Sequence, residues 1–153
     1  MKRNILTAAV RGTACILSLL LCGSYPAAAG NPADGSGTPA QSEITVNGGE
    51  MGTGLVQFEF SAGWVHEGGY PARFVGGDEH WSTTATSGAA LPSLTFRFSG
   101  TKVSLYGHKV PAGGMACVTI DGADAGVVDF YNAVRIEKTL LFESGILDNG
   151  DHT

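Results

Sequence analysis

Several short segments of the chain combine aromatic rings with planar or charged polar groups, and each lies where a turn between strands is expected. Flat aromatic faces pack against the C–H side of a sugar ring, while Asn, Arg and His side chains exchange hydrogen bonds with its hydroxyls. This pattern favours a carbohydrate-binding surface. The candidate ligand-binding residues are Trp64, His66, Tyr70, His80, Trp81, His108, Lys109, Tyr131, Asn132 and Arg135.

Packing is the competing interpretation for some of these rings. Trp81 lies in or beside a predicted strand, where an aromatic side chain usually covers a core. Trp64 follows Gly63 and an alternating segment, so both packing and binding remain open for it. Tyr131, Asn132 and Arg135 lie between two predicted strands, which favours exposure.

The motifs of common enzyme centres are missing from the sequence. It has no Gly-x-Ser-x-Gly elbow, no His-Glu-x-x-His helix and no phosphate-binding loop. His66, His80 and His108 are widely spaced, with no second ligand at a short interval, so a zinc site is not favoured. We therefore expect a non-catalytic protein rather than an enzyme.

Carboxylates give no clear acid/base pair either. Asp78 and Glu79 are adjacent, and neighbours on an extended chain point to opposite faces. No cofactor is expected, although Asp78 or Asp121 is a candidate ligand for a structural calcium ion.

The elements that must position these groups are strands. Alternation of apolar and polar residues predicts strands at residues 56–60, 94–98, 102–107, 116–120, 126–130 and 138–143. Asp121-Gly122 and the segment 148–151 predict turns. No segment has the apolar spacing of a helix. The expected fold class is therefore all-β, an antiparallel β-sandwich or barrel.

Length and charge narrow the range of functions. The chain has 153 residues, 23 of them glycine, and 15% charged residues, which leaves room for one domain built on short strands and tight turns. Its formal net charge of -5 argues against a nucleic-acid partner, because phosphate binding needs clustered Lys and Arg.

The first 29 residues have the pattern of a secretory signal peptide. Basic residues precede an apolar run that is too short to span a membrane, and small residues follow it, which predicts cleavage after Ala29. Lipidation at Cys22 is the less favoured alternative, because Leu21 stands where a small residue is usual. The expected product is secreted or at the cell surface, with no membrane span.

Cleavage changes the composition of what remains. Loss of Lys2, Arg3 and Arg11 would take the formal net charge from -5 to -8. Cys117 would be the remaining cysteine, and we expect it to be a small buried residue of a strand. Residues 30–42 have almost no apolar side chains and predict a flexible linker. The domain itself is expected at residues 43–153.

An ordered series of motifs then resembles a known family. His80-Trp81-Ser82, Phe96-Arg97-Phe98-Ser99-Gly100-Thr101, Val103-Ser104-Leu105-Tyr106-Gly107, Val118-Thr119-Ile120-Asp121-Gly122 and Gly150-Asp151-His152-Thr153 occur in that order. Together they are similar to accessory modules of the galactose-binding-like jelly-roll superfamily. The resemblance implies a jelly-roll β-sandwich that accompanies glycoside hydrolases and other secreted proteins. Superfamily members bind sugars or proteins, so the motifs specify the fold more than the ligand.

The sequence departs from this family at its end. In the family, the Gly-x-His-Thr element begins a last strand that a further strand follows, whereas this chain stops at Thr153. We therefore expect an incomplete domain whose last strand or strands are missing and whose terminal segment has no pairing partner.

Two partner classes follow from these observations. The favoured expectation is a non-catalytic module that binds poly- or oligosaccharide weakly through loop aromatics. The alternative is a surface structural or adhesion domain that pairs with a cell-surface protein by accepting a strand.

Overall fold

The fold was determined as a computed structural model, which describes residues 8–11, 15–17, 20–26, 41–82 and 91–153. Every pair of neighbouring strands in its sheets is antiparallel, as the alternating sequence predicts. The described residues contain no α-helix, and their one 3₁₀ turn is η1 (Val75–Gly77). No helix in these residues is long and apolar enough to cross a bilayer.

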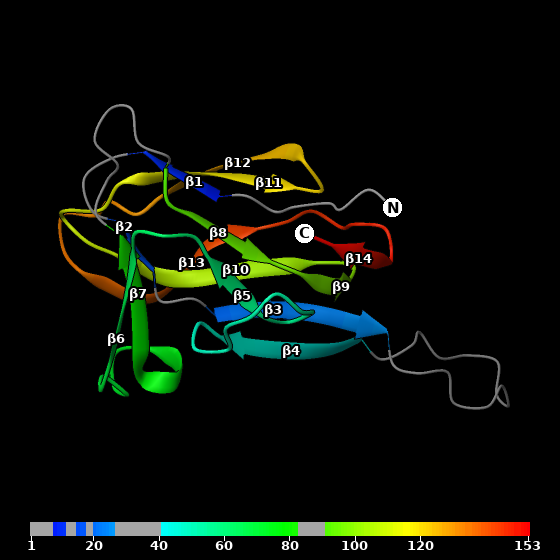
Figure 1. Cartoon of the computed structure of the whole chain (residues 1–153), viewed down its shortest axis with the longest axis horizontal. Helices are drawn as coiled ribbons and strands as arrows, with labels where there is room; N and C mark the ends of the chain where they lie inside the picture. Colours follow the sequence, from blue (N-terminus) through cyan, green and yellow to red (C-terminus); the bar gives the residue numbers. More distant parts are fainter. Residues whose placement is uncertain (1–7, 12–14, 18–19, 27–40, 83–90) are drawn as a thin grey trace, which may run out of the picture.

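Two larger sheets contain most of the strands (Figure 1). In spatial order, the strands of the first are β12 (Ala123–Asp129), β11 (Met115–Ile120), β1 (Ala8–Arg11), β8 (Ser93–Phe96) and β5 (Phe58–Phe60). Those of the second are β13 (Ile136–Glu143), β10 (Val103–Lys109), β3 (Leu20–Pro26) and β4 (Gln41–Asn47).

Two smaller sheets complete the described part of the chain. One contains β2 (Cys15–Leu17), β7 (Asp78–Ser82) and β6 (Trp64–Gly68), in that order. The other pairs β14 (Gly150–His152) with β9 (Phe98–Gly100). In Figure 1, β6 and β7 project from the main body together with η1.

The core is rich in phenylalanine. Phe58 is fully buried, and its ring lies 4.7 Å from that of Phe96, which in turn lies 6.1 Å from that of Phe98. Burial of such a side chain contributes roughly 1.5–3 kcal/mol. Ala116 and Val118 on β11 point into the same cluster, as their predicted face requires. These contacts join β5, β8, β9 and β11 around one apolar centre.

The same alternation places Cys117 outside. It lies between the buried residues Ala116 and Val118, and its thiol is exposed. The expectation of a buried cysteine was therefore wrong, because successive side chains of a strand point to opposite faces.

The turn predicted at Asp121-Gly122 is confirmed. Ile120 pairs with Ala123, so Asp121 and Gly122 form the whole loop of the β11–β12 hairpin. Their φ angles are 52° and 79°, the left-handed conformation that a type I′ hairpin turn requires. Asp and Gly tolerate this conformation better than most residues.

Two predicted strands are shorter or divided in the structure. The strand expected at residues 94–98 is interrupted at Arg97, which separates β8 from β9 and binds Glu59 at 2.7 Å. The strand expected from residue 56 begins at Phe58, because Val56 has a φ of 54°. Alternation predicted both strands, but neither interruption.

The outer strands carry irregular pairing. Between Gly107 and Lys109 on β10, the partner strand β13 contains one extra residue, and the φ of Lys138 in this stretch is 51°. A similar shift occurs in β12, which contains an extra residue opposite the step from Val118 to Thr119. These are β-bulges.

Residues of the predicted signal peptide form inner strands. β1 lies between β11 and β8, and β3 lies between β10 and β4 (Figure 1). The cleavage position after Ala29 and most of the predicted linker lie outside the described residues, while Gln41 and Ser42 belong to β4. Export and cleavage therefore stay predictions.

The chain end is paired, contrary to expectation. Gly150, Asp151 and His152 pair with Gly100, Ser99 and Phe98, so the segment expected to lack a partner forms β14 against β9. His152 and Thr153 are buried. Periodicity missed this pairing because β9 is a short strand that begins only after the break at Arg97.

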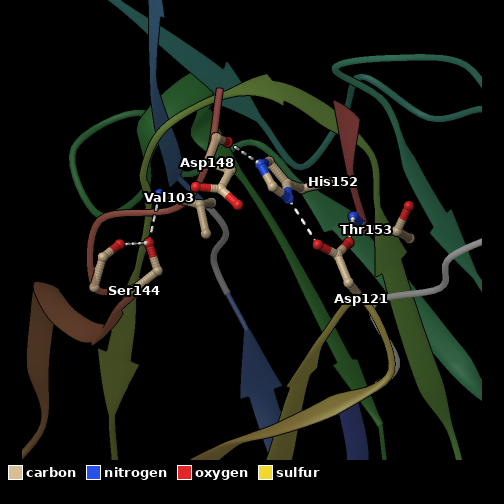
Figure 2. Close-up of polar contacts among 7 residues, drawn as sticks. Val103, Asp121, Ser144, Asp148, His152 and Thr153 are labelled. Carbon is tan, nitrogen blue, oxygen red and sulfur yellow. Dashed lines mark hydrogen bonds and ion pairs between the residues drawn. The ribbon is translucent and has the colours of Figure 1, made fainter. Parts of the chain in front are cut away.

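Figure 2 shows how polar contacts hold this end in place. Nδ1 of His152 lies 2.7 Å from Oδ2 of Asp121, and its Nε2 lies 2.7 Å from the carbonyl oxygen of Asp148. The backbone N–H of Thr153 donates to Oδ1 of Asp121 at 2.9 Å. Burial lowers the pKa of His152, but the hydrogen bonds to Asp121 and Asp148 outweigh it, and the net pKa is raised.

The substitution Asp121→Asn tests this contact. Asn keeps the left-handed turn and an acceptor for Thr153, but it removes the charge that favours protonated His152. We expect a loss of about 1 kcal/mol at pH 6, the difference between a charged and a neutral hydrogen bond. Because the folded pKa is raised, the stabilisation is complete below the unfolded pKa of about 6.5 and is lost as pH rises through the folded value.

Urea unfolding at several pH values measures both effects. The difference in stability between the wild-type protein and Asp121→Asn should be largest below pH 6.5 and should shrink as the pH rises above it. Asp124→Asn is the matched control, because that side chain contacts the N–H of Gly126 on the same hairpin and no histidine. Equal pH dependence of stability in the wild type and Asp121→Asn would show that the contact between His152 and Asp121 does not contribute.

Candidate functional site

The β6–β7 hairpin brings together chemistry from distant parts of the sequence. His66 pairs directly with His80, and Gly68 pairs with Asp78. Since side chains alternate along a strand, Asp78 and His80 share one face of β7, and Glu79 lies on the other. The prediction that Asp78 and Glu79 point to opposite faces agrees with their separate contacts.

The first face carries a continuous stack of rings. The Trp64 ring meets Phe60 edge-on at 5.4 Å, Phe60 stacks on His80 at 4.1 Å, and His80 stacks on His66 at 4.4 Å. Trp64 also donates its indole N–H to the carbonyl oxygen of Ser93 at 3.0 Å. For Trp64 these contacts favour packing over binding.

Asp78 completes this face. Its Oδ2 lies 3.1 Å from Nε2 of His66, whose side chain is 45% exposed. His80 is buried, and burial together with the nearby His66 lowers its pKa to about 4, although Asp78 acts in the opposite direction. His80 is therefore a neutral imidazole at pH 7.

The second face contains a buried polar group of different composition. Oε2 of Glu79 lies 3.7 Å from Nε2 of His108 and 3.7 Å from Nη2 of Arg135. Burial raises the pKa of Glu79, although Arg135 lowers it. Burial and Arg135 both lower the pKa of His108, to about 4. A carboxyl group and an imidazole thus adjoin with little solvent between them.

Rings and guanidinium groups lie around this second face. Phe74 is buried 5.4 Å from the His108 ring, and Arg135 lies over its face at 5.6 Å. Tyr70 meets Phe74 edge-on at 5.9 Å, and Arg73 lies 6.0 Å from the Tyr70 ring. Both guanidinium groups reach Oε1 of Glu137, at 3.7 Å for Arg73 and 3.2 Å for Arg135.

The structure places most of the predicted binding residues near these two faces. Tyr70, His108 and Arg135 surround Phe74, while His66, His80 and Trp64 share the ring stack. Lys109, Tyr131 and Asn132 lie around the end of β10: Lys109 pairs with Ile136, Val110 bridges to Tyr131, and the backbone N–H of Asn132 donates to the carbonyl oxygen of Val110. Trp81 is half-buried on β7.

Solvent exposure separates the predicted binding residues into two groups. Tyr70, Tyr131, Arg135 and His66 are open to solvent, whereas His80 and His108 are buried and offer no surface to a sugar.

Sequence reasoning named Asp78 only as a candidate calcium ligand. It missed several other contributors to these faces, namely Phe60, Phe74, Glu79, Arg73 and Glu137. The wide spacing of the histidines along the sequence suggested that none has a second metal ligand nearby. This was wrong for two of them, because strand pairing stacks His66 on His80. The signal that could have revealed this is the Asp78-x-His80 spacing, with an expected strand partner at His66.

The other calcium candidate is already engaged. Both carboxylate oxygens of Asp121 contact the chain end, one at His152 and one at Thr153. Asp121 also lines a pocket of about 440 Å³ between β12 and β13, together with Phe142 and Glu143. The predicted binding residues do not line this pocket.

Comparisons with known proteins leave the family open. No protein-family model matches the chain, and neither the curated proteins nor the solved structures gave a match. Function must therefore be argued from the contacts of this chain.

The buried histidines make the fold sensitive to acid. His108 is neutral in the folded protein, with a pKa of about 4, whereas an unfolded chain binds that proton near pH 6.5. The contribution of neutral His108 to stability is thus complete above pH 6.5 and is lost as pH falls toward 4. The loss that His108 contributes is about 3 kcal/mol, at 1.36 kcal/mol per pH unit.

His108→Leu tests this contribution. Neither ring nitrogen of His108 has a hydrogen-bond partner among the described residues, so leucine should cost little at pH 7. Thermal unfolding between pH 7 and pH 4 should show a smaller loss of stability than in the wild type. Lys109→Leu, at the neighbouring position of β10, should keep the wild-type slope, and an unchanged slope in His108→Leu would refute the contribution.

Proposed function

We propose that this chain is a secreted or cell-surface, non-catalytic module that binds glycans weakly. In this proposal the antiparallel strands form a jelly-roll β-sandwich of the galactose-binding-like kind, as the ordered motifs of residues 80–153 suggest. Export by the signal peptide of residues 1–29 is part of the same proposal. The ligand is a poly- or oligosaccharide.

One observation carries the glycan proposal. Exposed aromatic rings and guanidinium groups occur on two segments: Tyr70 is 38% exposed with Arg73 6.0 Å from its ring, and Tyr131 is 53% exposed on the segment that leads to Arg135. Glu137 contacts both Arg73, which lies at the Tyr70 ring, and Arg135, which lies over the Phe74 ring. A flat apolar face with fixed planar donors beside it suits a pyranose ring and its hydroxyls.

The arrangement also suits weak binding. Few side chains of this surface are enclosed, so a sugar would bury little area, and dissociation constants of about 1 μM to 1 mM are expected. Several copies on one surface would raise the apparent affinity through avidity.

A polysaccharide-retention screen followed by titration tests this proposal. Tyr131→Ala and Tyr70→Ala should each weaken binding to a retained glycan about tenfold, because each removes a stacking face. Ile146→Ala is the control, since it also truncates a large exposed apolar side chain, 81% exposed, but one outside the proposed surface. Failure to retain any plant, algal or host polysaccharide would refute the proposal.

A second candidate function is strand acceptance from a protein partner. The places of β1 and β3 favour it, because each lies between two other strands of its sheet. If export removes residues 1–29, then β8 and β11 lose a shared neighbour, and so do β4 and β10. Such vacated positions present unpaired backbone groups that a donor strand can satisfy.

Light scattering after size exclusion separates the two candidates. A chain that begins at Gly30 should form a discrete dimer, or fold only with an added partner, if it accepts strands. Adding a peptide of residues 8–26, which contains both β1 and β3, should convert such a dimer to monomer, while a scrambled peptide should not. A stable monomer without added peptide would exclude strand acceptance.

A further inference from the structure

Metal-ligating side chains converge on the first face of the β6–β7 hairpin. His66, Asp78 and His80 each offer a donor atom, and these atoms all lie within 4.8 Å of one another. Strand pairing places His66 opposite His80, and the two-residue spacing along β7 puts Asp78 on the same side. Of the proposed glycan surface, Arg135 contacts the other face of β7, at Glu79.

Two polar atoms of this cluster have unmet bonding capacity. Oδ1 of Asp78 and Nε2 of His80 are buried and have no hydrogen-bond partner among the described residues. His80 is only 3% exposed, so water cannot readily satisfy its nitrogen. Burying such atoms unpaired is costly, and a bound cation would remove that cost.

We propose that His66, Asp78 and His80 bind a divalent first-row transition-metal ion, with zinc as the ion best suited to the set. Two imidazole nitrogens and one carboxylate oxygen are a usual zinc donor set, and calcium or magnesium would demand mainly oxygen ligands. Three protein ligands leave a fourth tetrahedral position for water. The exposed side of His66 is where that position opens to solvent.

The three donor atoms need to move only a short distance to bind a zinc ion together. Zinc–ligand bonds of 2.0–2.1 Å place tetrahedral donor atoms roughly 3.3 Å apart. His66 and Asp78 are already 3.1 Å apart at Nε2 and Oδ2. The exposed His66 ring has room to turn toward the ion, whereas His80 is held by Phe60, stacked 4.1 Å away at an angle of 9°.

Gly49 provides space at the carboxylate. A Cβ atom at this position would lie 2.7 Å from Oδ2 of Asp78, so a larger residue would push the carboxylate aside. The loop after β4 therefore leaves Asp78 free to face the two histidines.

Calorimetric titration of the full chain with zinc chloride at pH 7.5 tests the site. We expect one ion per chain with a dissociation constant of about 1 μM or tighter. His66→Ala changes an exposed residue and should weaken binding at least tenfold, and Asp78→Asn should do the same. Glu67→Gln is the matched control, because Glu67 adjoins His66 but pairs with Glu79 on the opposite side.

Cobalt(II) gives a second readout that does not depend on heat. Visible d–d bands of a tetrahedral complex should appear with the wild-type chain and Glu67→Gln, and disappear with His66→Ala. Strong near-ultraviolet charge-transfer absorption would instead assign the ion to cysteine thiols and overturn the proposal. So would the absence of zinc binding, or equal affinity in His66→Ala. Glycan binding by the Tyr70 and Tyr131 surface is a separate measurement, so either proposal can fail alone.

Discussion

The register between β6 and β7 determines which functional groups of this protein meet. Because His66 lies opposite His80, one face of the hairpin gathers two imidazoles and the Asp78 carboxylate, and the other gathers Glu79, His108 and Arg135. A slip by one residue would exchange the two faces and bury a different set of charges. The ring of Phe60 against His80 helps to fix this register, since it packs only on the face that His80 occupies.

The sequence predicted the strands better than it predicted their contacts. Alternation along residues 116–120 identified both β11 and its buried face, and Asp121-Gly122 identified the hairpin turn. Breaks at Val56 and Arg97 escaped prediction, because both depend on backbone angles and long-range contacts that periodicity does not encode. The all-β class thus followed from local pattern, and the arrangement of its sheets did not.

In the candidate site, too, the residue types could be predicted from the sequence but their contacts could not. Residue types suited to binding were visible in Tyr70, Tyr131 and Arg135, and the structure leaves all three exposed. Burial of His108 and stacking of His66 on His80 depend on contacts between distant segments, so the spacing of these residues becomes informative only once the pairing of β6 with β7 is known. The first 29 residues are predicted to be a signal peptide, yet the structure builds three strands from them. A chain cleaved after Ala29 would lack β1, β2 and β3.

The bulges in β12 and β13 bear on how molecules of this protein meet in solution. Both strands lie at the outer margin of a larger sheet, where regular backbone groups would invite pairing with another copy. An extra residue in each, with the left-handed Lys138 in β13, disturbs the spacing of those groups and increases the local twist. At these two edges the irregular spacing disfavours edge-to-edge pairing with another copy of the chain.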